Sequence, residues 1–199
     1  MQRESISTAL VLAAVVLFIV PSHLRADDEA DEEQLLFAEP PGWHEVFAER
    51  EENLSTTEYV PEGQSDNDWE EMLTVQVLLE TPDADPDQLL SSVVNHLSGE
   101  CDAYAAQPIE LGGTGDYPTL GLMSMCGDLK YSDGGEFILI RGIAGKENFY
   151  LLQKSWRTPK FDLRDEPPVD LKQRKFWLGY LAYLRICSPE RGDCPKADE

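Results

Sequence analysis

The sequence predicts a single α+β domain in which helices pack on a twisted antiparallel β-sheet. Two observations favour this fold class. Most segments alternate in polarity or are rich in β-branched and aromatic residues, and short turns separate them. Only two segments combine helical periodicity with a recognisable start, and no internal repeat interrupts the order. A chain of 199 residues is about one domain long.

The first part of the expected domain supplies three strands. Residues 44–49 (HEVFAE) alternate roughly between apolar and polar side chains, and residues 53–61 are rich in β-branched and aromatic types. Residues 72–80 form the third strand, in which Leu73, Val75 and Val77 share one face. We expect residues 68–71 (DWEE), just before that strand, to form one helical turn.

The clearest helix follows these strands. Asp85 is a favourable N-cap, Pro86 suits the first helical position, and Gln88 completes a capping box. The helix should end at Gly99. Its buried side is an apolar stripe made of Leu89, Leu90, Val93, Val94 and Leu97.

The second half of the domain is predicted to be a meander of strands followed by a helix. We expect strands at residues 119–130, 137–143 and 149–156, with hairpin turns at 133–135 and 145–148. A proline-rich connection over residues 158–170 leads to the last helix, residues 171–185. The helix has a wide apolar face formed by Phe176, Trp177, Tyr180, Leu181 and Leu184.

Residues 1–26 have the layout of a cleaved secretory signal peptide. Arg3 precedes an apolar run at residues 9–20, Pro21 ends the run, and Ala26 is a small residue at a cleavage position. The alternative, a membrane anchor, would need about 20 apolar residues. A lipid anchor is excluded because the first cysteine is Cys101. We therefore expect a mature chain that begins at Asp27, lies in the periplasm or is secreted, and does not insert into a membrane.

The composition limits the classes of partner. The formal net charge is −22, and such a chain repels the phosphates of nucleic acids and the head groups of anionic lipids. High charge also keeps a protein soluble, and it can attract basic partners or divalent cations. The run DDEADEE at residues 27–33 has no apolar face, so we expect residues 27–34 to be a solvated, disordered tail.

Four cysteines in an exported chain predict two disulfides. Of the three possible pairings we expect Cys101–Cys126 and Cys187–Cys194. The second pair closes CSPERGDC, where a proline and a glycine let the chain turn back, and the first joins a helix end to a strand. A redox pair or a zinc site would usually need a C-x-x-C or a similarly close ligand pair, and the sequence has neither.

The candidates for catalytic or ligand-binding chemistry are few. Residues 112–116 (GGTGD) resemble a phosphate loop, but a strand follows where a helix and a lysine are needed. His96 could act as a base with Ser124 or Asp102, although no serine lies in a G-x-S-x-G motif. We expect His44 and the adjacent carboxylates Glu70 and Glu71 to have no catalytic role. We expect the tryptophans to lie mainly in the core; they are Trp43, Trp69, Trp156 and Trp177.

The order of elements resembles that of the PsbP-like family, which includes the extrinsic photosystem protein, the Ran-binding Mog-type protein and the periplasmic DcrB-type lipoproteins. The most specific piece is a Val60-Pro61 strand exit followed by residues 69–72 (WEEM). The similarity covers about residues 43–187. It implies a twisted antiparallel sheet flanked by helices and a non-enzymatic, partner-binding role. The chain departs from the family in lacking a lipid-anchoring cysteine and in having the Cys187–Cys194 hook, and no binding residue carries over.

These observations favour an exported, non-enzymatic binding or interaction protein of the bacterial cell envelope. The expected organisation is a signal peptide (1–26), an acidic tail (27–34), one α+β domain (35–187) and a disulfide-hooked tail (188–199). The expected partner is a protein or a small envelope ligand, with no cofactor, no metal and no nucleic acid. Two alternatives stay open. One is a periplasmic hydrolase that uses carboxylates or His96 in a sheet cleft, and the other is a protein that binds divalent cations or basic partners through its acidic surface.

Overall fold

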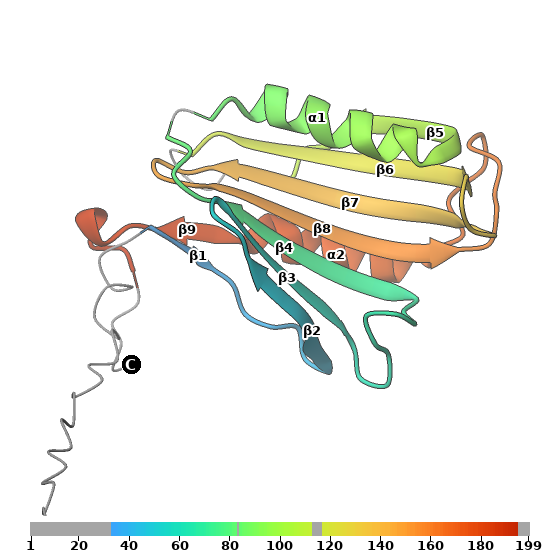
Figure 1. Ribbon diagram of the computed structural model, residues 1–199, viewed down its shortest axis with the longest axis horizontal. Coiled ribbons are helices and arrows are strands. Elements are labelled where there is room, and N and C mark those ends of the chain that lie inside the picture. The colour runs from blue at the N-terminus through green and yellow to red at the C-terminus, as the bar shows by residue number, and fades with distance from the viewer. Residues whose placement is uncertain (1–32, 83, 113–116, 195–199) are drawn as a thin grey trace, which may run out of the picture. The chain divides into compact units, whose positions relative to one another are not determined.

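The computed structural model describes residues 33–82, 84–112 and 117–194. Within these ranges the protein is an α+β fold made mostly of antiparallel strands, with two α-helices, as the sequence predicts (Figure 1). Seven strands form one sheet in which every neighbouring pair is antiparallel. In sheet order they are β2 (Trp43–Arg50), β3 (Leu54–Pro61), β4 (Glu71–Leu78), β8 (Phe149–Thr158), β7 (Gly135–Ala144), β6 (Thr119–Leu129) and β5 (Cys101–Pro108).

The sheet consists of two sequence-local meanders joined in the middle. Strands β2, β3 and β4 follow one another, and so do β5, β6, β7 and β8. The junction is the pairing of β4 with β8, which places Leu73 opposite Lys154 and Glu71 opposite Trp156. The register of this long-range pairing determines which side chains of the two halves share a face.

The first helix, α1 (Pro86–Gly99), lies on one face of the sheet and contacts β5, β6 and β7 (Figure 1). The Asp85 side chain accepts hydrogen bonds from the backbone N–H groups of Asp87 and Gln88, so the predicted N-cap is present. The apolar stripe packs on a cluster in β6, β7 and β8. The contacts of α1 are mainly with β5, β6 and β7, and neither described helix covers β3 and β4 on this face (Figure 1).

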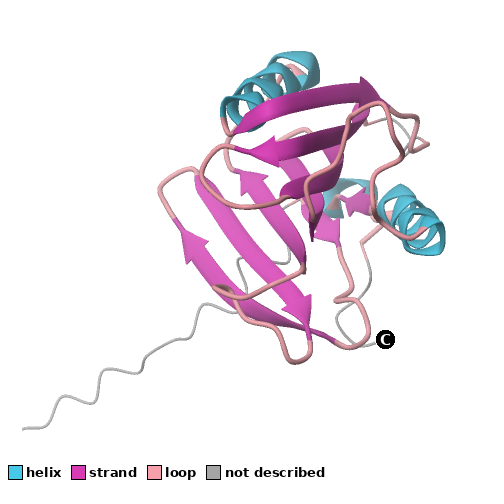
Figure 2. Ribbon diagram, turned by 90° about the vertical axis from the view of Figure 1, so that its right-hand side faces the viewer, coloured by secondary structure: helices cyan, strands magenta, loops and turns pink. Residues whose placement is uncertain are grey.

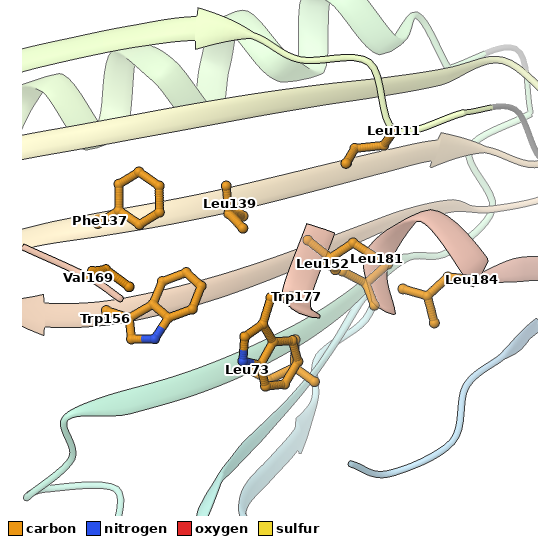
Figure 3. Close-up of a cluster of buried hydrophobic side chains, with 10 residues drawn as sticks. All are labelled: Leu73, Leu111, Phe137, Leu139, Leu152, Trp156, Val169, Trp177, Leu181 and Leu184. Atoms are coloured by element: carbon orange, nitrogen blue, oxygen red, sulfur yellow. The ribbon is translucent and has the colours of Figure 1, made fainter. Parts of the chain in front are cut away.

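The second helix, α2 (Leu171–Tyr183), lies on the opposite face, so the sheet is sandwiched between the two helices (Figure 2). Trp177 and Leu181 are buried against the inward side chains of β4, β7 and β8 (Figure 3). This cluster is the larger hydrophobic core, and its buried members are Leu73, Leu111, Phe137, Leu139, Leu152, Trp156, Val169, Trp177, Leu181 and Leu184.

A small second sheet joins the two ends of the domain. It pairs β1 (Gln34–Leu36) with β9 (Arg185–Cys187), which the sequence did not predict as strands. Glu33 is buried, and its carboxylate accepts a hydrogen bond from the backbone N–H of Lys146 at 2.8 Å. Residues 33 and 34, which we expected in the solvated tail, are therefore ordered; residues 1–32 lie outside the described residues.

Three local expectations need correction. Residues 68–71 do not form a helical turn, because the side chain of Gln64 accepts hydrogen bonds from the backbone N–H groups of Glu70 and Glu71 and leads the chain directly into β4. The last helix ends at Tyr183, two residues early, because the chain continues into β9. The expected strands did not include Cys101–Pro108, which forms the edge strand β5.

Both predicted disulfides are present. Cys101, the first residue of β5, is bonded to Cys126 in the neighbouring strand β6, with 5.7 Å between the Cα atoms. Cys187, the last residue of β9, is bonded to Cys194 across a 3-10 turn, η2 (Pro189–Arg191). Neither described helix is long and apolar enough to span a membrane.

Candidate binding cleft

A cleft among the described residues lies beside α1, at the edge of the part of the sheet that this helix covers. Its volume is about 530 Å³, and it opens between α1 and the surface of β3, β4 and β8. The cleft exists because α1 packs over β5–β7 and leaves the rest of this face open. Its lining residues are Asn53, Leu54, Gln76, Leu78, Leu89, Ser92, Val93, His96, Leu97, Phe149, Leu151 and Gln153.

A row of polar side chains crosses the floor of this cleft. Gln153 in β8 donates a hydrogen bond from Nε2 to Oε1 of Gln76 in β4 at 3.2 Å. Gln76 in turn donates from Nε2 to the hydroxyl of Thr56 in β3 at 3.4 Å. The row fixes the orientation of both amides, and the carbonyl oxygen of Gln153 accepts no hydrogen bond from the described residues. A ligand can therefore use that oxygen as an acceptor.

The remaining surface of the cleft is mainly apolar. Leu89, Val93 and Leu97 from α1 face the buried side chains of Phe149 and Leu151 in β8. At the rim, the Ser92 hydroxyl donates to the carbonyl of Gln88 one turn earlier, and His96 is exposed. An apolar wall opposite a few oriented polar groups is the usual composition of a small-molecule site.

The cleft has no fixed charge. None of its twelve described lining residues is Asp, Glu, Lys or Arg, whereas 27% of the whole chain is charged and the net charge is −22. A charged ligand that entered the cleft would lose hydration and find no counter-charge there. The arrangement therefore favours an uncharged, amphipathic ligand, which leaves His96 as the only ionisable group that such a ligand would meet.

The structure does not assemble the catalytic group that His96 could have formed. The Ser124 hydroxyl is buried and donates to the Tyr104 hydroxyl at 3.2 Å, and Asp102 is exposed at the start of β5. Among the described residues no hydrogen bond joins His96 to either side chain. His44 lies at the start of β2, where its Nδ1 is buried and has no hydrogen-bond partner among the described residues.

The other predicted candidates also lie apart. Glu70 is exposed, while Glu71 is paired with a buried lysine, so the two carboxylates do not converge. Within the described residues, no group of His, Cys, Asp and Glu could hold a metal ion. Of the glycine-rich segment only Gly112 is described. Its carbonyl accepts a hydrogen bond from the Thr119 hydroxyl, and residues 113–116 lie outside the described residues.

The tryptophans divide between core and surface. Trp156 and Trp177 are buried in the larger core, as expected. Trp69 is partly exposed, and the guanidinium carbon of Arg157 lies 3.9 Å from the centroid of its ring. Trp43 packs edge-to-face on Trp177 with 5.0 Å between the ring centroids.

Two buried cations were missed by the sequence analysis. Lys154 is fully buried on the α2 face of the sheet, where burial lowers its pKa to about 7 although Glu71 opposes the shift. Arg141 is also fully buried; it donates to the carbonyl of Leu111 at 3.1 Å, and its Nε has no partner among the described residues. Burial lowers the pKa of Arg141 as well.

Comparison with known proteins assigns no relative. The chain matches no protein-family model, and a search of curated proteins found no match. The function is therefore inferred from the chemistry of the cleft and from the compartment that the sequence predicts.

Proposed function

We propose that the protein is an exported binding protein of the bacterial cell envelope that holds a small, neutral, amphipathic ligand in the cleft beneath α1. The observation that carries the proposal is the uncharged lining of this cleft in a chain of net charge −22. Binding rather than catalysis is favoured because His96, Ser124 and Asp102 do not gather into a catalytic group.

The predicted leader and the disulfides support the compartment. Disulfides persist in oxidising compartments such as the periplasm, and both pairs here are formed. The signal peptide at residues 1–26 and the periplasmic location remain part of the proposal. Membership of the PsbP-like family is also part of the proposal, and an antiparallel sheet with a helix on each face is compatible with it.

A pair of fluorescent probes with one skeleton tests the charge argument. N-phenyl-1-naphthylamine is neutral, and 1-anilinonaphthalene-8-sulfonate adds a single sulfonate to the same skeleton. We expect saturable fluorescence enhancement with the neutral probe and binding at least about tenfold weaker with the sulfonate, because the cleft offers no cation to replace the lost hydration. Equal or tighter binding of the sulfonate would show that the cleft does not select for neutral ligands.

A further inference from the structure

A second concave surface lies on the other side of the molecule, along the outer face of α2. This groove, about 530 Å³ in volume, runs between α2 and the segment that follows β1. It is distinct from the cleft beneath α1, because α1 and α2 lie on opposite faces of the sheet (Figure 2). Its lining residues are Leu36, Ala38, Lys175, Phe176, Gly179, Tyr180, Tyr183 and Leu184.

The groove exposes two aromatic side chains on either side of a notch. Phe176 is 56% exposed and Tyr183 is 79% exposed. Gly179 lies between them, three residues after Phe176 and four before Tyr183, so all three share one side of the helix. A Cβ placed on Gly179 would meet no atom within 4 Å. The space above Gly179 is therefore open, and the two exposed rings flank it.

The α2 side of the groove is basic in an otherwise very acidic chain, while Glu39 lies near Tyr180 on the opposite side. The segment Leu171–Tyr183 contains Lys172, Arg174 and Lys175 and no acidic residue, while the chain has 38 acidic and 16 basic residues. Arg174 is paired with Glu166 at 2.9 Å. Lys172 and Lys175 are exposed and form no ion pair within the described part of the chain. Two charges are therefore available to a partner on the same side of the helix as the notch.

We infer that this groove docks an acidic segment of another protein, which inserts an apolar side chain into the notch at Gly179 between Phe176 and Tyr183. Lys172 and Lys175 would pair with carboxylates of that segment. Lys172 and Lys175 favour an acidic segment at this site, and exposed aromatic residues around a pocket commonly carry most of the binding free energy. The inference does not depend on the cleft beneath α1.

The geometry argues against the other two occupants. A lipid surface is a flat anionic plane, so it would meet the acidic remainder of the protein as well as α2, and it would not fill a concave notch. A second copy docked through the same groove about a two-fold axis would bring Lys172 and Lys175 of both copies together. An acidic peptide segment meets neither objection.

A peptide array with the mature, disulfide-bonded protein provides the test. The array carries acidic peptides in which Leu or Phe recurs at helical spacing, together with matched sets in which Lys replaces the acidic residues or Gly replaces the apolar ones. We expect the protein to bind the acidic-apolar set and neither matched set. We expect Lys172→Glu with Lys175→Glu to abolish this binding, and Phe176→Ser with Tyr183→Ser to weaken it at least about tenfold.

Two matched controls separate the groove from general surface effects. Tyr131 is 83% exposed outside the groove, and Lys146 is exposed in the β7–β8 turn. Tyr131→Ser and Lys146→Glu should bind the peptides like the unaltered protein. The lysine variants change exposed positions only, so their folding is secure even if Phe176→Ser disturbs the neighbouring rings of Trp177 and Tyr180.

Four results would overturn the inference. They are no preference for the acidic-apolar peptides, equal binding by groove and control variants, cosedimentation with phosphatidylglycerol vesicles that depends on Lys172 and Lys175, and a concentration-dependent dimer that the groove variants abolish. The last two would assign the groove to a membrane or to a second copy of the chain.

Discussion

The ammonium group of Lys154 lies 3.0 Å from the Glu71 carboxylate, and the lysine is fully buried while the glutamate is 24% exposed. The ammonium also lies 3.9 Å from the ring centroid of Trp156 and 5.0 Å from those of Trp43 and Trp177. Three indole rings, one carboxylate and the backbone carbonyl of Ser155 therefore replace the water around this cation. The aromatic box ties β2, β8 and α2 together at the centre of the larger core.

This buried lysine predicts a specific dependence of stability on pH. Burial lowers the pKa of Lys154 from 10.5 to about 7, so the unfolded chain binds this proton more tightly than the folded one. The contribution of Lys154 to the free energy of unfolding should therefore rise between about pH 7 and about pH 10. Below about pH 7 the cost of burying the charge is constant, and above about pH 10 it vanishes.

A Lys154→Met variant should remove this rise, because methionine keeps an apolar stem over the indole rings and carries no titratable group. Urea unfolding at several pH values measures the effect, and Lys146→Met controls for the loss of an exposed lysine. The stability difference between Lys154→Met and the unaltered protein should be largest at and below about pH 7 and shrink toward about pH 10. A stability difference that is independent of pH would contradict the lowered pKa of Lys154.

Removing the partner of this lysine should cost stability in a position-specific way. Glu71→Ala leaves the Lys154 ammonium buried without a carboxylate, and we expect the free energy of unfolding to fall by about 3 kcal/mol. Glu70→Ala changes the same residue type one position earlier, where the side chain is exposed, and should cost no more than about 0.5 kcal/mol. Chemical denaturation of both variants measures the contrast; equal losses would show that the pair with Lys154 is not formed.

The two disulfides should differ in what they contribute. The Cys101–Cys126 bond spans 25 residues and the Cys187–Cys194 bond spans 7. Loop-closure entropy then predicts a loss of about 3.5 kcal/mol for the paired change of Cys101 and Cys126 to serine, and about 2.4 kcal/mol for the other pair. Denaturation of the double-serine variants checks the order, and peptide mapping without reduction checks the pairing. A bond between Cys101 and Cys194 would contradict both.

Local features of the fold were predictable from the sequence because their signals are local. Asp85 and Pro86 mark the start of α1, Leu73, Val75 and Val77 mark the inward face of β4, and the turn around Gly134 marks the β6–β7 hairpin. The disulfide pairing was also predictable, since each bond joins segments that the expected helices and turns bring together.

The long-range features were not predictable. The pairing of β4 with β8 joins residues that are 71 to 85 positions apart in the sequence. The three-residue strands β1 and β9 depend on each other for their hydrogen bonds. A lysine is normally expected at the surface. The alternation of Lys154 with Leu152 and Trp156 nevertheless places it on the inward face of β8. That alternation is the signal that the sequence analysis missed.

The cleft was missed for a similar reason. Gln76 and Gln153 lie on adjacent strands only because β4 pairs with β8, so nothing in either local segment indicates that their amides meet. His96 was noticed in the sequence, and the structure places it at the rim of the cleft. Its neighbours in the cleft lining are amides, apolar side chains and the Ser92 hydroxyl, which donates its hydrogen bond to the carbonyl of Gln88.

The cleft beneath α1 is the proposed binding site, and two adjacent serines allow this assignment to be tested directly. Ser91 and Ser92 are both exposed on α1 and both donate a hydrogen bond to the carbonyl four residues earlier, but only Ser92 lines the cleft. Ser92→Trp should fill part of the cleft, whereas Ser91→Trp places the same bulk outside it. The measurement is the dissociation constant for N-phenyl-1-naphthylamine in the two variants and in the unaltered protein. We expect binding to be weakened at least about tenfold in Ser92→Trp and unchanged in Ser91→Trp, and equal affinities in all three proteins would contradict the proposed site.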